Sequence, residues 1–351
     1  MEKKQLGHWE SQMTERYSRQ ILFEGVGREG QNRLRQSRAT IIGCGALGTA
    51  LAEALARAGI GQLCIADRDF VEASNLQRQT MFTERDAAER LPKAIACARH
   101  VREINSDVVV EPEIVDANHS NAERLIPNCG VVLDGTDNFA TRYLINDACI
   151  KHDVNWIYGA AVGSYGVTMT VRANQTPCLR CVFPEAPPAA SAPTCDTAGV
   201  IMPIVSIVAA VQVSEALKLL TGHTEDLHNS LMQFDVWRNE WRGISLRDRA
   251  PDCKTCGQRQ FETLETNNRE FAAILCGRHA VQISPAQPAR VDLAALGQKL
   301  QPVGEVKAND YLIRFRTGDY ELTVFQDARS IIRGTDDIAT ARSLYAKYIG
   351  N

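Results

Sequence analysis

The stretch ATIIGCGALGTALAEALARAGIGQLCIADRDFV, residues 39–71, decides the fold of this chain. An apolar run leads into GCGALG, and apolar residues then recur at helical spacing from Leu47 to Ala58, where Gly59 ends the pattern. A second apolar run, QLCIAD, follows and ends in an acidic residue. The stretch therefore predicts a strand, a glycine turn, a helix and a second strand, the first unit of a parallel sheet.

The same alternation continues along the chain. A helix is expected from Pro92 to Ile104, followed by the strand VVVEPEIV, and the strand VVLDG precedes a helix that begins around Phe139. The strand WIYGA comes next. We find no internal repeat. The order predicts an α/β fold with a doubly wound, Rossmann-like and mostly parallel sheet.

Near residues 257–268 the pattern changes to a polar connector. We therefore predict two domains, a main domain at 1–257 and a small C-terminal α+β domain at 258–351, to which the sequence assigns no activity. An irregular loop is expected at PEAPPAASAP, residues 184–193. The elements expected in the small domain are the strand HAVQIS, the helix VDLAALGQKL, two hairpin strands within DYLIRFRTGDYELTVFQDA and a last helix in ATARSLYAKYIG.

Composition excludes several functional classes. A net charge of −3 in 351 residues gives no attraction to nucleic acid or to an anionic membrane. The polar N-terminal residues contain no signal-peptide apolar block. The longest apolar run, 198–213, is expected to be too short to span a bilayer. It predicts instead a buried helix that starts near Pro203 and ends before Gly222, in a cytoplasmic protein.

The glycine turn has the spacing of a nucleotide site. Gly43 permits the tight turn, Gly45 lets a phosphate approach the backbone, and Gly48 allows close packing of helix and strand. The helix N-terminus offers free N–H groups to an anion. Asp67, at the end of the second strand, is placed to accept hydrogen bonds from a ribose. By themselves these features favour an NAD-dependent oxidoreductase.

Charged residues beyond the second strand favour different chemistry. Arg78 lies in SNLQRQ, Lys93 starts a helix after Pro92, and Asp137 follows the strand VVLDG. Two cations around a polyphosphate, with a carboxylate placed for Mg²⁺, suit nucleotidyl transfer, whereas hydride transfer needs none of them. Asp134 is interpreted as a helix cap or turn former. A scaffold that binds a partner without catalysis is disfavoured by the complete charged set.

Two CxxC motifs predict a metal site. Eleven cysteines without an export signal indicate a reducing compartment, in which thiols serve as metal ligands or nucleophiles. Four thiolates from two short turns form the usual structural Zn²⁺ site, and thioredoxin-like redox chemistry is the less favoured alternative. The predicted ligands are Cys178, Cys181, Cys253 and Cys256. The remaining cysteines are expected to be packing residues, except Cys195, which precedes the buried helix.

These motifs together make the chain resemble the MoeB/ThiF family, relatives of the ubiquitin-activating enzymes. The resemblance covers about residues 14–257. Ala46 stands where many relatives have glycine, and RLPK replaces the frequent GxPK. The motifs that carry it are RYSRQ, GCGALG, DRDFVEASNLQRQ, LPK, DGTDNF, GVTMTV, the paired CxxC motifs and TCDTAGV.

The resemblance implies an adenylyltransferase. Family members use ATP and Mg²⁺ to adenylate the C-terminal glycine of a ubiquitin-like sulfur carrier, ThiS-like or MoaD-like, for thiamine or molybdopterin synthesis. Asp67 would hold the ribose, Arg78 and Lys93 the phosphates, and Asp137 the Mg²⁺. The remaining residues implied around the nucleotide are Gly43, Gly45, Ala46, Gly48, Asp69, Ser74, Asn75, Gln79 and Asn138.

Further expectations concern partners. Arg19 would reach the γ-phosphate of the partner subunit in a symmetric homodimer, and Cys195 would take part in sulfur transfer with a separate sulfur donor protein. The alternative for Arg19 is a surface ion pair on its own helix. Gly159, Gly163 and Gly166 are a hypothetical slot for the carrier's extended tail, although glycine there also suits a simple turn. A tRNA-modifying dehydratase that also adenylates is a further alternative within the family.

Overall fold

The computed structural model describes residues 15–126, 128–185, 195–265, 271–275, 279–285 and 289–350. The chain divides into two compact units, Met1–Glu265 and Thr266–Asn351. Each unit has its own sheet and its own buried core. Our domain boundary from the sequence, between 257 and 258, lies a few residues before this division.

An eight-stranded sheet organises the first unit, in the order β3-β2-β1-β4-β5-β6-β7-β8. The five strands from β3 to β5 pair in parallel, as expected for a doubly wound fold. The chain leaves β1 in one direction to form β2 and β3, and in the other to form β4 and β5. Such a reversal opens a crevice at the carboxyl ends of the strands. These strands are β1 (Arg38–Ile42), β2 (Gln62–Asp67), β3 (Val109–Ile114), β4 (Val131–Asp134) and β5 (Trp156–Val162).

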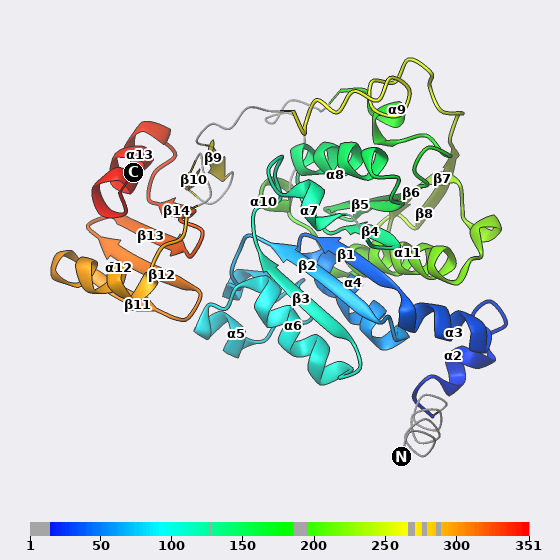
Figure 1. Cartoon of the computed structure of the whole chain (residues 1–351), viewed down its shortest axis with the longest axis horizontal. Helices are drawn as coiled ribbons and strands as arrows, with labels where there is room; N and C mark the ends of the chain where they lie inside the picture. Colours follow the sequence, from blue (N-terminus) through cyan, green and yellow to red (C-terminus); the bar gives the residue numbers. More distant parts are fainter. Residues whose placement is uncertain are drawn as a thin grey trace. The chain divides into compact units, whose positions relative to one another are not determined.

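Helices cover both faces of this sheet (Figure 1). One face is covered by α4 (Ala46–Ala58), α6 (Lys93–Ile104) and α11 (Met202–Thr221), and the other by α7 (Ala122–Leu125) and α8 (Phe139–Lys151). The shorter helices of the unit are α2 (Ser18–Leu22), α3 (Gly27–Gln36), α5 (Glu84–Glu89), α9 (Leu179–Val182), α10 (Cys195–Ala198) and the 3-10 turns η1 (Ala73–Asn75) and η2 (Thr224–Asp226).

The helix α11 confirms the predicted buried helix, because it begins beside Pro203 and Gly222 ends it in the left-handed conformation. Our argument from length was wrong, since its 20 residues are long and apolar enough to cross a membrane. However, α11 packs against β5, β6 and α4, and core helices of soluble proteins can be equally long and apolar. The helix therefore gives only weak evidence for a membrane span.

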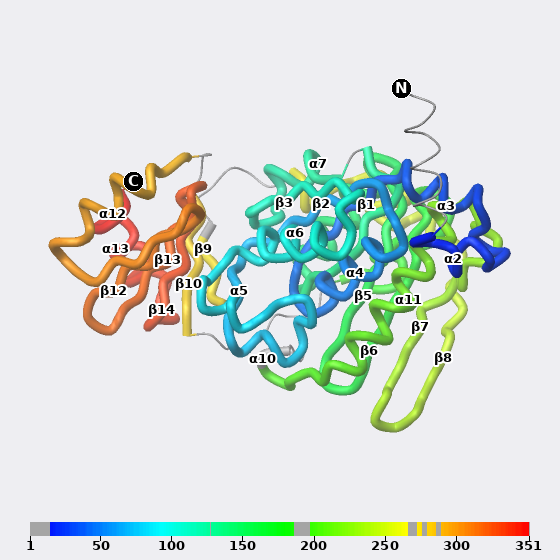
Figure 2. The backbone as a smooth tube through the Cα atoms, turned by 90° about the horizontal axis from the view of Figure 1, so that it is seen from below, coloured from blue at the N-terminus to red at the C-terminus, as the bar shows by residue number. Residues whose placement is uncertain are grey.

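Three antiparallel strands extend the sheet beyond the part that we predicted. They are β6 (Tyr165–Val171), β7 (Ser230–Asp235) and β8 (Glu240–Ser245). The hairpin formed by β7 and β8 extends away from the helices (Figure 2). Trp237 and Trp241 in this hairpin are largely exposed. The sheet is therefore mixed, with a parallel half and an antiparallel half.

In its described residues, the second unit is a six-stranded antiparallel sheet with two α-helices, in the strand order β11-β12-β13-β14-β10-β9. It confirms the expected small α+β fold, including the hairpin of β12 and β13. Leu296 from α12 and Tyr345 from α13 pack in one core with strand residues such as Phe315. The elements are β9 (Phe271–Leu275), β10 (Ala280–Ser284), α12 (Leu293–Leu300), η3 (Gln301–Val303), β11 (Glu305–Ala308), β12 (Leu312–Thr317), β13 (Tyr320–Phe325), β14 (Ser330–Arg333) and α13 (Ile338–Tyr348).

Candidate functional site

The glycine turn between β1 and α4 is packed backbone against backbone. A Cβ atom on Gly48 would lie 1.9 Å from the carbonyl oxygen of Gly43, and one on Gly135 would lie 2.2 Å from the same oxygen. Gly43 has a φ of +88°, which also favours glycine. The turn therefore brings β1, α4 and the end of β4 to their closest approach, and it tolerates no side chain at Gly43, Gly48 or Gly135.

Gly45 is different because the space beside it is open. A Cβ atom there would meet nothing nearer than the Gln79 side-chain nitrogen, at 3.8 Å. Gly45 precedes Ala46, the first residue of α4, so the unpaired N–H groups of the helix start here. Gln79 is buried, and within the described part of the chain its Oε1 has no hydrogen-bond partner. The free N–H groups suit an anion at the start of α4, and the Gln79 oxygen suits a ligand group that donates a hydrogen bond.

Asp67 lies at the end of β2, beside the glycine turn. Its carboxylate accepts hydrogen bonds from the backbone N–H of Cys44, at 2.6 Å, and of Asp69, at 2.7 Å. Burial raises the pKa of Asp67, and the charge of Lys93 opposes that rise. Both backbone donors fix the carboxylate at the carboxyl edge of the sheet, where a ribose would lie.

Lys93 is the first residue of α6, and its side chain is buried. Its Nζ lies 3.4 Å from Oδ2 of Asp69, and its backbone N–H donates to the carbonyl of Asp69 at 2.9 Å. The structure thus brings Asp67, Asp69 and Lys93 together, as the sequence suggested. It also shows what Asp69 does, because both the side chain and the backbone of Asp69 bind Lys93.

The loop that contains SNLQRQ is held by its own hydrogen bonds. Asn75 is buried, and its side-chain oxygen accepts from the backbone N–H of Glu72 at 3.2 Å. Its carbonyl oxygen accepts from the backbone N–H of Arg78 and of Gln79. Arg78 donates to the carbonyl of Ser74 at 3.0 Å and stays partly exposed. Asn75 therefore shapes the loop, while Ser74 and Arg78 lie on its outer side.

Asp137 is exposed and lies just before α8. The side-chain nitrogen of Asn138 donates to it at 3.3 Å, and the oxygen of Asn138 caps α8 by accepting from Thr141 N–H. Asp137 is therefore accessible for a metal ion, whereas Asn138 is engaged in the helix cap.

Arg68 is a residue that sequence reasoning missed. Burial opposes its charge, but the carboxylates of Asp116, Asp69 and Asp137 raise its pKa well above the usual value. Its guanidinium also lies 3.3 Å from Asp116. In the sequence, the only indication of this ionic environment was the position of Arg68 between the two acidic residues of DRD.

Arg19 lies far from this crevice in its own chain. Gln20, the next residue, donates to the carbonyl of Ala58, the last residue of α4. The glycine turn is at the other end of α4, and 13 residues of helix span about 20 Å. Arg19 is exposed, and its guanidinium contacts no partner among the described residues. It cannot reach the crevice of its own chain.

The hypothetical tail slot is only partly open. A Cβ atom on Gly159 would lie 2.5 Å from the Gln212 side chain, and one on Gly166 would lie 2.4 Å from Val208. These two glycines therefore make room for α11. Gly163 has a φ of +62° with open space beside it, and its backbone pairs with Gly199 and Ile201.

Cys195 begins the short helix α10, but its side chain lies outside the described residues. The segment that follows α10 pairs with Gly163, at the end of β5. The chain after Cys195 is thus attached to the carboxyl edge of the sheet.

The four cysteines of the CxxC motifs converge. Their sulfur atoms all lie within 4.8 Å of one another, with Cys178 3.7 Å from Cys253 and Cys181 3.4 Å from Cys256. Hydrogen bonds among the thiols raise the pKa of Cys178 and lower that of Cys256. Four sulfur ligands in this arrangement fit a tetrahedral Zn²⁺ ion.

One buried carboxylate supports both cysteine motifs. Asp147 of α8 accepts hydrogen bonds from the hydroxyls of Thr255, at 2.6 Å, and Thr263, at 2.8 Å. Arg180, between the first two cysteines, lies 3.8 Å from the same carboxylate. Because Thr255 lies between the other two cysteines, α8 holds both motifs.

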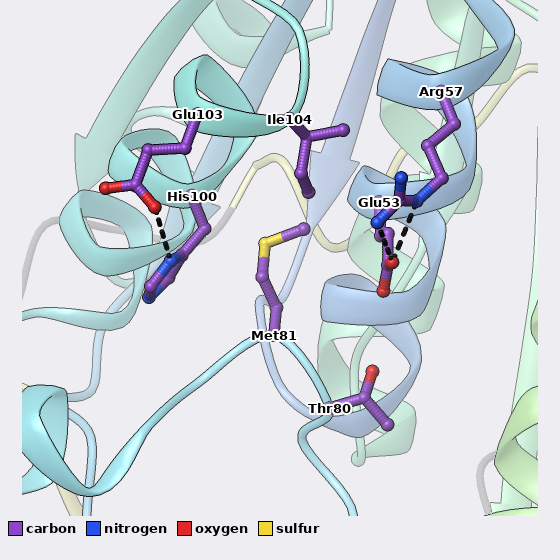
Figure 3. Close-up of a pocket in the computed structure, with 7 residues that line it drawn as sticks. All are labelled: Glu53, Arg57, Thr80, Met81, His100, Glu103 and Ile104. Atoms are coloured by element: carbon purple, nitrogen blue, oxygen red, sulfur yellow. Dashed lines mark hydrogen bonds and ion pairs between the residues drawn. The ribbon is translucent and has the colours of Figure 1, made fainter.

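A pocket of about 450 Å³ lies away from these residues, between the later turns of α4 and α6 (Figure 3). Arg57 and Glu53 of α4 form one side, and His100 and Glu103 of α6 the other. Met81 closes it from the loop after SNLQRQ. Its wall carries both charge signs already paired, so it gives no indication of a ligand.

The other cysteines behave as expected for packing residues where the structure describes them. Burial raises the pKa of Cys64 to about 11, and it also raises that of Cys149 above its ordinary value. Cys44 and Cys97 are also buried, Cys129 is half-buried, and Cys276 lies outside the described residues.

Comparisons with known proteins agree with this architecture. The family model described as "ThiF family" matches residues 17–255. The sulfur carrier protein ThiS adenylyltransferase of Bacillus subtilis is 49% identical over 342 residues, covering 96% of this chain and 100% of that protein. The sulfur carrier protein adenylyltransferase of Thermus thermophilus is 34% identical over 71% of this chain and 93% of its own length.

Among solved structures, Escherichia coli MccB with ATP superposes with a TM-score of 0.61. The sequences are 22% identical, and the match covers 69% of this chain and 74% of that chain. At this level of identity, the likeness shows a shared fold.

Proposed function

This chain belongs to the ThiF family, and on that premise we propose that it is an ATP-dependent adenylyltransferase for a ubiquitin-like sulfur carrier. The likeness to the Bacillus subtilis ThiS adenylyltransferase, over the whole length of that protein, supports this function. The observation that carries it is the crevice in which Asp67, Asp69 and Lys93 meet the open start of α4. An NAD-dependent oxidoreductase would have no use for Lys93 and Arg78.

In the proposed reaction, an oxygen of the carrier's C-terminal carboxylate attacks the α-phosphorus of ATP. The bond between the α-phosphorus and the bridging oxygen breaks, which gives an acyl-adenylate and pyrophosphate. Asp67 would accept the ribose hydroxyls, and the N–H groups beyond Gly45 would hold a phosphate. Lys93 and Arg78 would stabilise the negative charge that develops on the leaving pyrophosphate.

Mg²⁺ would be held by Asp137, whose exposed carboxylate lies just before α8 and is within electrostatic reach of Arg68. Bound there, the ion would neutralise phosphate charge. Zn²⁺ would be held by Cys178, Cys181, Cys253 and Cys256, with a structural function.

The proposed assembly is a homodimer in which Arg19 acts on the partner subunit's ATP. Arg19 is exposed at the end of α4 opposite to its own crevice, so it can serve catalysis only across an interface. A planar guanidinium supplied in trans matches phosphate oxygens in several nucleotide-hydrolysing enzymes. A closed two-fold dimer would then contain two equivalent sites.

A ThiS-like carrier is the favoured substrate, since the relative that matches over its full length is named for ThiS. This choice would place the enzyme in thiamine rather than molybdenum-cofactor synthesis, in the cytoplasm. Cys195 would then react with the activated carrier, and a separate donor protein would supply the sulfur. The attachment of the segment after Cys195 to the end of β5 supports a position near the adenylate.

The test is ATP–pyrophosphate exchange with purified ThiS-like and MoaD-like carriers. We expect exchange that depends on the carrier, that is faster with the ThiS-like protein, and that is lost in Asp137→Ala. Asp319→Ala, which changes an acidic residue of a surface turn in the second unit, is the matched control. Exchange without any carrier, or none with either carrier, would refute the proposal.

A further inference from the structure

A buried ion pair lies behind the loop that carries Asp137. Asp134 ends β4 and is fully buried, and Arg142 in α8 is 5% exposed. The Nε of Arg142 lies 3.2 Å from Oδ2 of Asp134. A buried ion pair often gives no more stability than an apolar pair of the same size. The contacts that it makes with its surroundings are therefore more informative than its charge.

Both members of the ion pair form hydrogen bonds with the backbone of the same two residues, Thr136 and Gly159. Asp134 accepts from the N–H of Thr136, at 2.8 Å, and from that of Gly159, at 3.5 Å. Nη2 of Arg142 donates to the carbonyl of Thr136, at 2.8 Å, and to that of Gly159, at 3.3 Å. In each of these two residues, the backbone N–H donates to the Asp134 carboxylate and the backbone C=O accepts from the Arg142 guanidinium.

The guanidinium is also fixed in orientation. The rings of Phe139 and Tyr158 each lie 5.4 Å from its carbon atom. The backbone around the ion pair is held as well, because the side chain of Gln212, from α11, donates to the carbonyls of Asp134 and Ile157 at 3.1 Å each. Only a planar group with several donors can bond Asp134, Thr136 and Gly159 at once, and a lysine side chain at position 142 could not make all of these contacts.

We propose, on the basis of the adenylation function above, that Arg142 is a positioning residue for that reaction. Thr136 directly precedes Asp137, and Gly135 abuts the carbonyl of Gly43. By fixing Thr136 to β5, Arg142 sets the place of the Asp137 carboxylate relative to the glycine turn. It acts through the backbone and touches no reacting atom.

The first test is Arg142→Lys, which keeps the positive charge but loses the fork of donors. We expect kcat of carrier-dependent pyrophosphate exchange to fall about 100-fold, the cost of a displacement of about 1 Å. The KM for ATP should change less than about threefold, because Gly45, Asp67 and Lys93 keep their contacts.

A second variant separates positioning from stability. Replacing both charges, in Asp134→Leu with Arg142→Met, leaves no unpaired buried charge and is expected to fold. Because the N–H and C=O groups of Thr136 and Gly159 lose their partners, the melting temperature should fall. The kcat of the folded double variant, measured below its melting temperature, should stay as low as that of Arg142→Lys. Glu215→Gln is the control, because this buried carboxylate bonds Thr170 in β6, away from the crevice. It should lower stability and leave kcat unchanged.

Two results would overturn the assignment. Wild-type kcat in a folded double variant would show that Arg142 has only a structural part, and so would a loss confined to the KM for ATP. If the wild-type enzyme exchanges pyrophosphate and both variants equal it, only the positioning role fails. If the wild type shows no carrier-dependent exchange, the proposed function fails as well.

Discussion

The glycine turn and the cysteine cluster are built in opposite ways. At the turn, Gly43, Gly48 and Gly135 bring backbone atoms so close that a single methyl group would collide with a carbonyl oxygen. At the cluster, Cys178 and Cys256 belong to a set of four side chains that converge on one point. The first site depends on absent side chains and the second on present ones. A substitution at the turn should therefore disturb the packing of the backbone, whereas a substitution at the cluster should reduce the retention of a metal ion.

The largest expected effect comes from Gly48→Val. A Cβ atom there would lie 1.9 Å from the Gly43 oxygen, so β1 and α4 must move apart. We expect the free energy of unfolding to fall by about 3 kcal/mol or more, with loss of ATP binding. Chemical denaturation and ATP titration measure both.

Gly45→Ala is the matched control, because the nearest atom to its Cβ lies at 3.8 Å. This variant should keep its stability and lose only affinity for ATP. Equal loss of stability in the two variants would show that the turn is not packed as described.

The next effect is at the cluster. Cys256→Ser should release Zn²⁺ and lower the free energy of unfolding by about 3 kcal/mol or less. Exchange per folded molecule should fall less than about threefold, since the crevice residues are untouched. Metal analysis and denaturation check the two parts. Cys129→Ser, outside the cluster, should retain its metal; a zinc loss there as well would make the four-sulfur site untenable.

Lys93→Met tests the side-chain half of the nucleotide site. Removing the cation leaves Asp69 and Asp67 close together without it. The KM for ATP should rise about 10- to 100-fold, the value of a charge-assisted hydrogen bond. Steady-state kinetics measure it, with the exposed Lys307→Met as control. An unaltered KM would remove Lys93 from the phosphate contacts.

The smallest effect is a pH dependence. Burial raises the pKa of Asp67 above the ordinary value of about 4. The folded protein then binds more protons than the unfolded chain between the two pKa values, so this group's contribution to stability falls as the pH rises through that interval. ATP binding, which needs the carboxylate, should instead be lost as the pH falls through the folded-state pKa.

Denaturation and ATP titration between pH 4 and 7 test these opposite trends, each below about 1.4 kcal/mol per pH unit. In Asp67→Asn both slopes should flatten. Parallel curves for wild type and variant would assign the pH dependence to other groups.

The two sites are alike in what their sequences revealed. GCGALG and the CxxC pairs are local signatures, so both places were predictable without a fold. The start of α6 at Lys93 was predictable too, because proline favours the first turn of a helix. Their shared feature is that the decisive residues are close together in the sequence.

Long-range contacts were not predictable in this way. Arg142 reaches Gly159 past the rest of α8 and a loop, and Asp147 accepts a hydrogen bond from Thr255, 108 residues away. No local pattern marks such pairs. The antiparallel strand β8 was also missed, because it is an edge strand exposed on both faces and lacks the alternation of a half-buried strand.

The carboxylate of Asp147 has a consequence for the proposed Zn²⁺ site. Hydrogen bonds to Thr255 and Thr263 tie the second cysteine motif to α8, and Arg180 brings the first motif to the same point. These contacts hold both cysteine motifs to α8. A bound ion would therefore be retained by the packing of α8 as well as by its four sulfur ligands.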